Sequence, residues 1–415
     1  MGCARGRECY HGPMRILFLL SQRPELTGSG ITLDALVRQA SAHGHEPWVL
    51  CGVPVDEPVP SVGGLPPERV LTVTFGDGGA LPYAVPGMSD VMPYRSTVWS
   101  AMTEPQLQAY RETWRTALVA AAGTVRPDII HTNHLWLMSS LATTALPDVP
   151  MVAHCHATGL RQMALCPHLR DEVVAGLGRL SGVVVLHQDH AAQVVDTLGL
   201  SPERVHEVGA GYRDDLFHDR GAVNPPGHLL YVGKFAAAKG VPWLLDACEI
   251  LWATGAEFTL HVAGAGDADL SRRLADLAPR VIVHGRLAQP ELADLMRRCS
   301  ALVLPSFYEG LPLVLAEARA CGCRLVSTAL PGVVRRLAPA FTEALTLVPM
   351  PRLEGPDTPV ADDLPAFTEA LKRAMADTLG APTMAVGSDE LTPLTWSSVY
   401  ERVATAWAKA VRTAP

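Results

Sequence analysis

The chain has 415 residues, a length that suits two domains of about 200 residues each. Its residues are 48% hydrophobic and 18% charged, as in ordinary globular α/β proteins, and its formal charge of −8 argues against non-specific binding to nucleic acid or an anionic membrane. No apolar run approaches the roughly 18 residues that a membrane helix requires. Any phosphate site must therefore be built from local cations and backbone amides.

The cysteines and the first residues both bear on where the protein resides. Nine cysteines are scattered along the chain without a CxxC pair, which favours reduced thiols in the cytoplasm over a disulfide framework or a zinc site. Residues 1–13 are polar and lack the apolar stretch of a secretory signal. We interpret them as a disordered leader before a first strand that begins at Met14.

Residues 14–208 alternate between apolar runs and amphipathic segments, which predicts a parallel α/β domain. The run at 15–20 reads as a buried strand, and the loop at 21–30 feeds a helix. Gly28 and Gly30 lie just before this helix, where glycines let the backbone approach a phosphate or another ligand closely. A plain turn explains the same two glycines equally well.

Residues 76–105 interrupt this rhythm. The segment is rich in Gly and Pro but also contains large side chains such as Tyr83, Tyr94, Arg95 and Trp99. A purely flexible linker would not carry so many of them. We expect an ordered loop that lines one side of a cleft, with Tyr94 and Arg95 facing a ligand. The alternative is that its large side chains simply cover the core.

Histidines follow two neighbouring strands of this half. His131 and His134 lie at the end of the strand at 127–131, and His154 and His156 lie at the end of the next strand. Open parallel sheets place their sites at such carboxyl ends. Alternation along a strand would point His154 and His156 to opposite faces, and no carboxylate accompanies them, so a metal site is disfavoured. The four histidines are candidates for a site at this edge of the sheet or for structural roles.

The alternation restarts over residues 209–390 and predicts a second doubly wound sheet. The strand at 229–233 ends at Gly233 and is followed by Lys234 and Lys239, which lie at the head of a helix. Two ammonium groups in this position can hold a diphosphate and stabilise the charge that a departing diphosphate gains. Two solvated surface lysines are the alternative.

Two further strand ends of this half carry Gly264 with Gly266 and Arg286 with Leu287. Directly after Gly266, the pair Asp267 and Asp269 matches a D-x-D pattern that can hold a metal. Such short patterns arise readily by chance, and a helix start favours capping by the first aspartate. We therefore predict no essential metal and no cofactor.

Residues 302–322 are the most informative stretch. A buried run is followed by a short loop and an apolar helix, for which Pro312 suits the first turn and Gly322 the position just past the end. The helix is apolar nearly all round, so it is expected to be embedded. A carboxylate inside such a helix, here Glu317, needs hydrogen-bond donors.

Glu309 lies at the mouth of this helix, and Glu317 stands five residues beyond Pro312, roughly 7.5 Å along the helix axis. Two carboxylates placed in this way can grip two hydroxylated parts of one extended ligand. The free amides of the first turn between them would take an anion. A sugar joined to a nucleotide through phosphates has this chemistry.

Glu309 and Glu317, separated by seven residues and followed by Ala318 and Gly322, resemble the E-x7-E signature of the retaining glycosyltransferases of family GT4. The resemblance extends over nearly the whole chain, from about Met14 to about Trp407, and includes the phosphatidylinositol mannosyltransferases and the mycothiol-pathway glycosyltransferase.

The resemblance implies the GT-B fold, in which two doubly wound, Rossmann-like parallel-sheet domains face a cleft. Residues 14–208 would then bind the acceptor and residues 209–390 the nucleotide-sugar donor. The final helix, within residues 391–415, is expected to cross back onto the first domain.

The resemblance also implies roles for single residues. His156 falls on the cleft histidine of the mannosyltransferases, in a segment of the form P-h-V-A-x-x-H-T. His156, Glu309 and Lys239 are the expected catalytic residues, and His134, Tyr94 and Arg95 the expected acceptor-side residues. The expected donor-binding residues are Gly28, Gly30, Gly233, Lys234, Lys239, Gly264, Gly266, Arg286, Leu287, Glu309, Gly310, Leu311, Pro312 and Glu317.

The implied reaction is transfer of a sugar from a UDP- or GDP-sugar to a small polar acceptor, with retention of configuration and without a metal. The composition, rich in Ala, Arg, Gly and Pro, indicates a GC-rich bacterial source. The unusual segment at 76–105 favours a specialised small-molecule acceptor, and we expect a polar metabolite of a natural-product pathway. An NAD-dependent Rossmann oxidoreductase would need G-x-G-x-x-G, which no glycine pair of this chain completes. A non-hydrolysing sugar-nucleotide epimerase shares the two-sheet architecture and stays open as an alternative.

Overall fold

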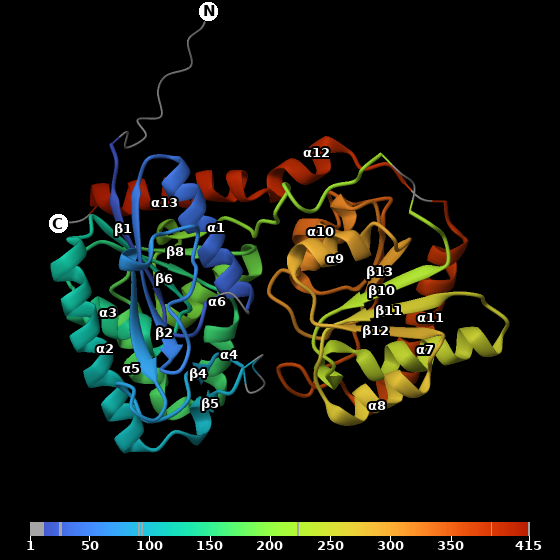
Figure 1. Cartoon of the computed structure of the whole chain (residues 1–415), viewed down its shortest axis with the longest axis horizontal. Coiled ribbons are helices and arrows are strands. Elements are labelled where there is room, and N and C mark those ends of the chain that lie inside the picture. The colour runs from blue at the N-terminus through green and yellow to red at the C-terminus, as the bar shows by residue number, and fades with distance from the viewer. Residues whose placement is uncertain are drawn as a thin grey trace, which may run out of the picture. The chain divides into compact units, whose positions relative to one another are not determined.

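The computed structural model describes residues 12–413 except 25, 26, 90, 91, 93, 222, 223 and 383. Contacts divide the chain into unit 1, residues 1–209 with 396–415, and unit 2, residues 210–395 (Figure 1). The sequence had placed these boundaries at 208 and 391. The predicted leader, except for its last two residues, lies outside the described part of the chain.

Unit 1 is built on a seven-stranded parallel sheet with the order β3-β2-β1-β6-β7-β8-β9. Its strands are β1 (Arg15–Leu20), β2 (Glu46–Pro54), β3 (Val70–Phe75), β6 (Ile129–Asn133), β7 (Met151–His154), β8 (Gly182–Val185) and β9 (Val205–Glu207). The order reverses between β1 and β6, which pair with Phe18 opposite His131. In open parallel sheets, ligands bind beyond the carboxyl ends of the strands at such a reversal.

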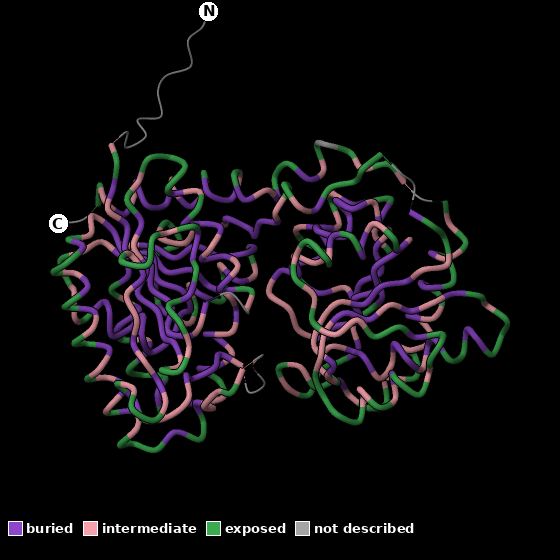
Figure 2. The backbone as a smooth tube through the Cα atoms, in the orientation of Figure 1, coloured by how far each residue is buried: buried purple, intermediate pink, exposed green. Residues whose placement is uncertain are grey.

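Helices cover both faces of this sheet, and its central strands are buried, whereas the edge strand β9 is half-buried (Figure 2). They are α1 (Gly28–Ala42), α2 (Glu104–Val125), α3 (Leu137–Ala145), α4 (Thr158–Leu165), α5 (Pro167–Leu177), α6 (Gln188–Leu198) and α13 (Trp396–Thr413). Helices α2, α3 and α5 pack on one face, while α1 and α13 pack on the other. Trp407 of α13 meets Phe18 edge to face, with ring centroids 5.8 Å apart.

The last helix thus packs back on the first unit, as the resemblance implied, but its predicted start was wrong. We had expected one helix from residue 391 onward. Instead α12 (Ser388–Leu391) ends, a short 3-10 turn holds Pro393, and α13 begins at Trp396. Proline lacks an amide hydrogen and restrains the residue before it, so one continuous helix cannot form there.

In the described part of residues 76–105, the large side chains cover the core. Met88 and Trp99 are buried in it, and Tyr83 and Tyr94 pack against it. Two short strands, β4 (Pro86–Gly87) and β5 (Thr97–Val98), pair to close the segment. Tyr94, which we had placed on the acceptor side, packs against this core, whereas Arg95 is exposed.

Unit 2 contains a six-stranded parallel sheet with the order β12-β11-β10-β13-β14-β15. Its strands are β10 (His228–Val232), β11 (Thr259–Ala263), β12 (Val281–Gly285), β13 (Ala301–Leu304), β14 (Arg324–Thr328) and β15 (Leu345–Val348). Its helices are α7 (Val241–Ala253), α8 (Ala268–Asp276), α9 (Gln289–Met296), α10 (Leu313–Ala320), α11 (Leu364–Gly380) and α12. Two doubly wound sheets were predicted, and both are present.

Strand β15 lies in the segment at 339–363, which is rich in Pro and Asp. Its four residues show no clear periodicity and stand among prolines and aspartates, so the strand is defined by pairing with β14. The order of this sheet reverses between β10 and β13. The loops after these two strands carry the lysines and Glu309.

Candidate functional site

Lys239 and Glu309 meet at the reversal point of unit 2. Lys239 ends a short 3-10 helix (Ala237–Lys239) after β10, and Glu309 lies in the loop between β13 and α10. The Nζ atom of Lys239 lies 2.7 Å from Oε1 of Glu309 and donates to the carbonyl of Tyr308 at 3.0 Å. Both charged side chains are 24% exposed, so a ligand can reach the pair.

Gly240 explains how the two loops come this close. Its φ is +71°, and a Cβ atom there would lie 2.1 Å from the carbonyl oxygen of Pro305. Any other residue would push the head of α7 away from the end of β13. The glycine thus places Lys239 beside Tyr308 and Glu309.

Gly264 and Gly266 also serve close packing between loops. A Cβ atom at Gly264 would lie 1.9 Å from the carbonyl oxygen of Gly233, and one at Gly266 would lie 2.3 Å from that of Phe235. The amide of Gly264 donates to the carbonyl of Gly285 at 2.7 Å. The loops after β10, β11 and β12 are therefore held together.

The remaining predicted residues of this edge lie on the same loops. Lys234 is half-buried, and its carbonyl accepts a hydrogen bond from Tyr231 at 2.7 Å. Arg286 is exposed and Leu287 is half-buried just after β12. In the loop before α10, Gly310 is half-buried while Leu311 and Pro312 are buried.

Helix α10 buries two charges, and the protein satisfies one of them. Arg319 donates to the carbonyl of Ala385 at 2.5 Å and lies 2.8 Å from the carboxylate of Glu390. The carboxylate of Glu317 is also buried, yet none of the described residues donates a hydrogen bond to it. Burial accordingly raises the pKa of Glu317 to about 7. The described residues therefore leave this carboxylate available to donors of a ligand or of solvent.

Asp267 caps α8, as the sequence indicated. Its carboxylate accepts from the amides of Asp269 and Leu270, at 2.9 and 3.0 Å. Asp269 is exposed and pairs with Arg272. Across the described ranges, no three His, Cys, Asp or Glu residues are grouped as metal ligands would be.

Replacing Asp267 by alanine is expected to lower the free energy of unfolding by about 1 kcal/mol, because the first turn of α8 loses its acceptor. Transfer activity, with or without EDTA, should not change. Asp276→Ala, at the other end of the same helix, is the matched control and should not destabilise the protein. If Asp267→Ala loses transfer activity and added metal restores it, the result would support a metal site at the D-x-D pattern. Urea unfolding and initial rates are the measurements.

At the reversal point of unit 1, Asn133 fixes His156. The Oδ1 atom of Asn133 lies 2.9 Å from Nε2 of His156, and its Nδ2 donates to the carbonyl of Leu19 at 3.1 Å. Because the amide nitrogen is used as a donor, Oδ1 faces the imidazole and can only accept. His156 therefore carries its proton on Nε2 and a lone pair on Nδ1.

The rings of His154 and His156 stack, with centroids 4.4 Å apart and planes 4° apart. Our expectation that they point to opposite faces was wrong. Strand β7 ends at His154, and Ala157, with a φ of +66°, turns the chain, so strand alternation does not reach His156. His131 is buried and accepts from Nε1 of Trp407 at 3.0 Å, as a structural residue would.

These imidazoles are neutral. Burial lowers the pKa of His134 and His154 to about 3, with His154 adding to the shift of His134. Burial, reinforced by His154 and His134, holds the pKa of His156 well below its ordinary value. A neutral imidazole exchanges hydrogen bonds with hydroxyl groups and does not neutralise a phosphate.

His134 lies beside His156, with ring centroids 5.0 Å apart, and its Nδ1 is 3.1 Å from the hydroxyl of Thr158. Its φ of +71° is uncommon for a residue with a side chain, and such strain is often found at functional sites. The sequence analysis missed His187 and His190, whose rings lie 3.8 Å apart at the start of α6. The signal was available, because His187 follows β8 as His134 follows β6.

The two N-terminal glycines open α1. Thr27 caps the helix and accepts from the amide of Gly30 at 3.2 Å, so that amide already has a partner. No atom would contact a Cβ at Gly28. Gln22, which the sequence analysis also missed, donates to Ser29 at 3.1 Å and accepts from the amide of Met88 at 3.3 Å. It thereby ties this loop to the segment at 76–105.

In the part of the chain that the structure describes, no helix combines the length and the apolar character needed to cross a membrane.

Comparison with known proteins gives one family match in each half of the chain. Residues 26–215 match the family described as Glycosyltransferase Family 4, and residues 226–377 match the family described as Glycosyl transferases group 1. Glycogen synthase of Mycobacterium tuberculosis (strain H37Rv) is 29% identical over 338 residues, which are 77% of this chain and 79% of that protein. D-inositol 3-phosphate glycosyltransferase 1 of Catenulispora acidiphila is 30% identical over 241 residues, 50% of this chain and 57% of its own length.

A solved structure supports the fold. Anabaena Alr3699/HepE, in complex with UDP and glucose, superposes with a TM-score of 0.59 at 16% identity and 96% coverage of each chain. Two parallel sheets, the E-x7-E helix and these matches lead to one conclusion: the chain belongs to family 4 of the glycosyltransferases and is an enzyme with the GT-B fold.

Proposed function

We propose that this glycosyltransferase moves a sugar from a UDP- or GDP-sugar to a small polar acceptor, with retention of configuration and without a metal. The Lys239–Glu309 pair carries the proposal. A donor diphosphate would draw the ammonium group toward itself, and the negative charge that grows on the departing nucleotide would strengthen that contact in the transition state. Glu309 would then be available to accept hydrogen bonds from hydroxyl groups of the sugar.

Glu317 supports a nucleoside as the other end of the donor. Its buried carboxylate has no donor among the described residues, and the two ribose hydroxyls would supply two. Arg319, on the same helix, is satisfied by the protein and is not proposed to contact the ligand.

In unit 1 we propose that His156 accepts a hydrogen bond from a sugar hydroxyl through Nδ1, the ring nitrogen that Asn133 leaves with its lone pair. His134 and the exposed Arg95 would lie on the acceptor side. In a front-face reaction, a phosphate oxygen of the donor takes the proton of the acceptor hydroxyl, so no protein base is required. The low pKa of the imidazoles is in keeping with that division of roles.

The names of relatives support the substrate classes. One relative is named as a glycosyltransferase of D-inositol 3-phosphate, a small polar acceptor, and Alr3699/HepE is solved with UDP and glucose. Seven described cysteines are buried outside any disulfide, which suits a reducing cytoplasm. We place the reaction there, in bacterial specialised metabolism.

A thermal-shift screen tests the donor assignment. A ligand that binds only the folded state raises Tm, so UDP or GDP should raise it more than ADP or dTDP. NMR of the product formed from the donor so identified should show the anomeric configuration of that donor, with and without EDTA. An inverted product, or loss of transfer in EDTA, would contradict the mechanism. Conversion of a UDP-sugar without acceptor would favour the epimerase instead.

Asn133→Ala is expected to lower kcat about tenfold, because His156 loses the hydrogen bond that fixes its proton on Nε2. Asn133→Asp keeps an acceptor at that position and should recover most of the activity. Its carboxylate should also raise the pKa of His156 and shift the pH profile of kcat/KM toward higher pH. Equal losses in both variants, with an unchanged pH profile, would show that Asn133 serves packing alone. Steady-state kinetics as a function of pH makes the distinction.

A further inference from the structure

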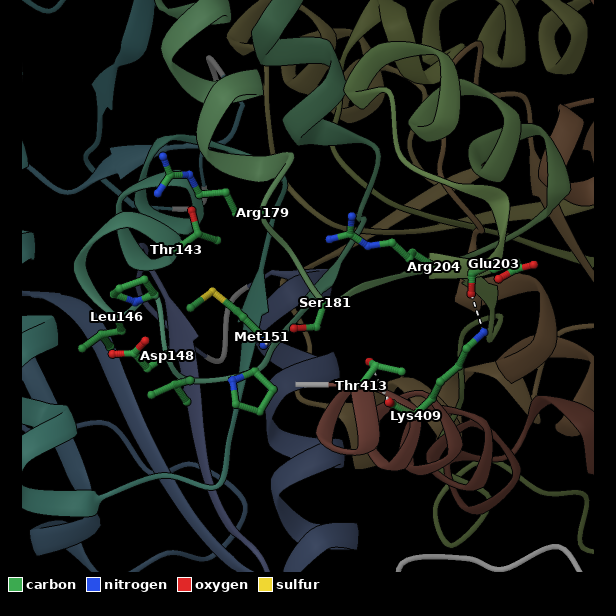
Figure 3. A pocket seen from close by; sticks show the side chains of 13 residues that line it. Thr143, Leu146, Asp148, Met151, Arg179, Ser181, Glu203, Arg204, Lys409 and Thr413 are labelled. Atoms are coloured by element: carbon green, nitrogen blue, oxygen red, sulfur yellow. Dashed lines mark hydrogen bonds between the residues drawn. The ribbon is translucent and has the colours of Figure 1, made fainter. Parts of the chain in front are cut away.

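Unit 1 has a second concave site, at the opposite edge of its sheet from the histidines. This rear hollow has a volume of about 720 Å³ and lies where β7, β8 and β9 begin, next to the last turns of α3 and α13 (Figure 3). Its lining residues include Met151, Ser181, Arg204 and Lys409. Small-molecule sites usually have volumes of about 300–1,000 Å³. The rear hollow is separate from every residue proposed above for sugar transfer.

Arg204 is a half-buried cation of this hollow that has no counter-charge among the described residues. Its side chain reaches over the hollow on the side of Ser181 in Figure 3, and no ion pair or hydrogen bond of its guanidinium is found within the described ranges. Burial alone lowers the pKa of Arg204, and no neighbouring carboxylate opposes that shift. Taking a charge out of water without a partner is costly, so an anion would be stabilised here.

The other cations of the hollow are less suited than Arg204 to bind an anion. Lys409 turns away and donates to the carbonyl of Glu203 at 2.6 Å (Figure 3), and Arg179 is exposed at the rim. The hydroxyl oxygen of Ser181 accepts from the amide of Met151 at 3.1 Å, so its hydrogen is available to a ligand. A guanidinium and a hydroxyl donor are therefore both available in the lining of the hollow.

The rest of the lining is largely apolar, apart from the exposed side chains of Asp148 and Glu203. Leu146, Val149 and Pro150 are half-buried and Met151 is fully buried, all in the segment that leads from α3 into β7. We propose that the rear hollow binds a small soluble organic anion, whose carboxylate or phosphate contacts Arg204 and Ser181 and whose apolar part lies on this apolar lining. The fork of a guanidinium suits either oxyanion.

Phenyl phosphate is the probe, because it joins a phosphate to an apolar ring, and benzyl alcohol is the uncharged control. Calorimetric titrations use the full-length chain with Lys239→Ala as background, so that the phosphate site proposed in unit 2 is weakened. We expect saturable binding of phenyl phosphate and none of benzyl alcohol. Arg204→Gln in that background should weaken binding about tenfold or more, since a hydrogen bond to a charged group is lost. Arg204→Lys, which keeps the charge, should lose less.

Arg170→Gln, an exposed arginine of α5, is the matched control and should bind as the background does. Arg204→Gln in an otherwise wild-type chain should transfer sugar at the wild-type rate. This result would show that binding in the rear hollow is independent of the reaction site, whether or not the roles proposed for Lys239 hold. Equal affinity in the Arg204→Gln and background proteins, equal binding of benzyl alcohol, or no saturable binding to the background would each overturn the proposal.

Discussion

Replacing Lys239 by alanine is expected to lower kcat/KM for sugar transfer by about 10²- to 10³-fold, the loss typical when one preorganised charge partner of a transition state is removed. The loss should fall mainly on kcat, because the negative charge of the departing diphosphate grows as the bond to the sugar breaks. The fold should tolerate the change. Lys239 and Glu309 are partly exposed, so their pairing contributes less than about 1 kcal/mol to stability.

Unit 2 offers a closely matched control. Lys372 and Glu369 of α11 form an ion pair at the same 2.7 Å distance, and the exposure of the lysine side chain is 25% against 24% for Lys239. Lys372→Ala should leave both kinetic constants unchanged. Steady-state kinetics with a saturating acceptor measure kcat and KM, and circular dichroism checks that each variant is folded. Wild-type turnover in Lys239→Ala, or an equal loss in Lys372→Ala, would remove Lys239 from the mechanism.

Glu317→Gln is expected to stabilise the unliganded protein while it weakens donor binding. In the folded protein burial raises the pKa of Glu317 to about 7, above the ordinary glutamate value of 4.5. The folded state therefore holds this proton more tightly than the unfolded state, and the cost of ionising the buried carboxylate grows as the pH rises from about 4.5 to about 7. The variant should be more stable than wild type by roughly 3 kcal/mol at pH 8, with no difference at pH 4.

The same substitution should raise the donor KM about 10- to 100-fold, because hydrogen bonds to a charged acceptor contribute about 1.5–3 kcal/mol. Urea unfolding at the two pH values and donor titration measure the two effects. Glu257→Gln, an exposed glutamate of the same unit, should show neither. A variant less stable than wild type at pH 8 would mean that the carboxylate already has a donor within the protein.

Much of unit 2 could be predicted because its signals are local. Pro312, Gly322 and the apolar run between them define α10 without reference to the rest of the chain. The same run shows that Glu317 and Arg319 are both buried. It does not show that Arg319 donates to backbone carbonyls some 65 residues later in the chain, while Glu317 has no partner among the described residues. This difference depends on where residues 384–390 pack.

The histidines of unit 1 show where sequence reasoning stops. Their placement at strand ends was predictable, but the stacking of His154 on His156 depends on which residue ends β7 and on the backbone turn at Ala157. The bond from Asn133 to Leu19 joins residues 114 positions apart and settles the proton position on His156. The rear hollow likewise combines α3, β9 and α13, whose meeting no local pattern encodes.

The placement of α13 has a consequence for biosynthesis. Unit 2 is one continuous segment of chain, whereas unit 1 combines residues up to 209 with residues from 396 onward. Val399, Val403 and Trp407 are buried on the sheet face that carries Phe18. As the chain emerges from the ribosome, the second half can complete its core while the first still exposes an apolar face. We expect nascent chains stalled before residue 396 to recruit chaperones to that face.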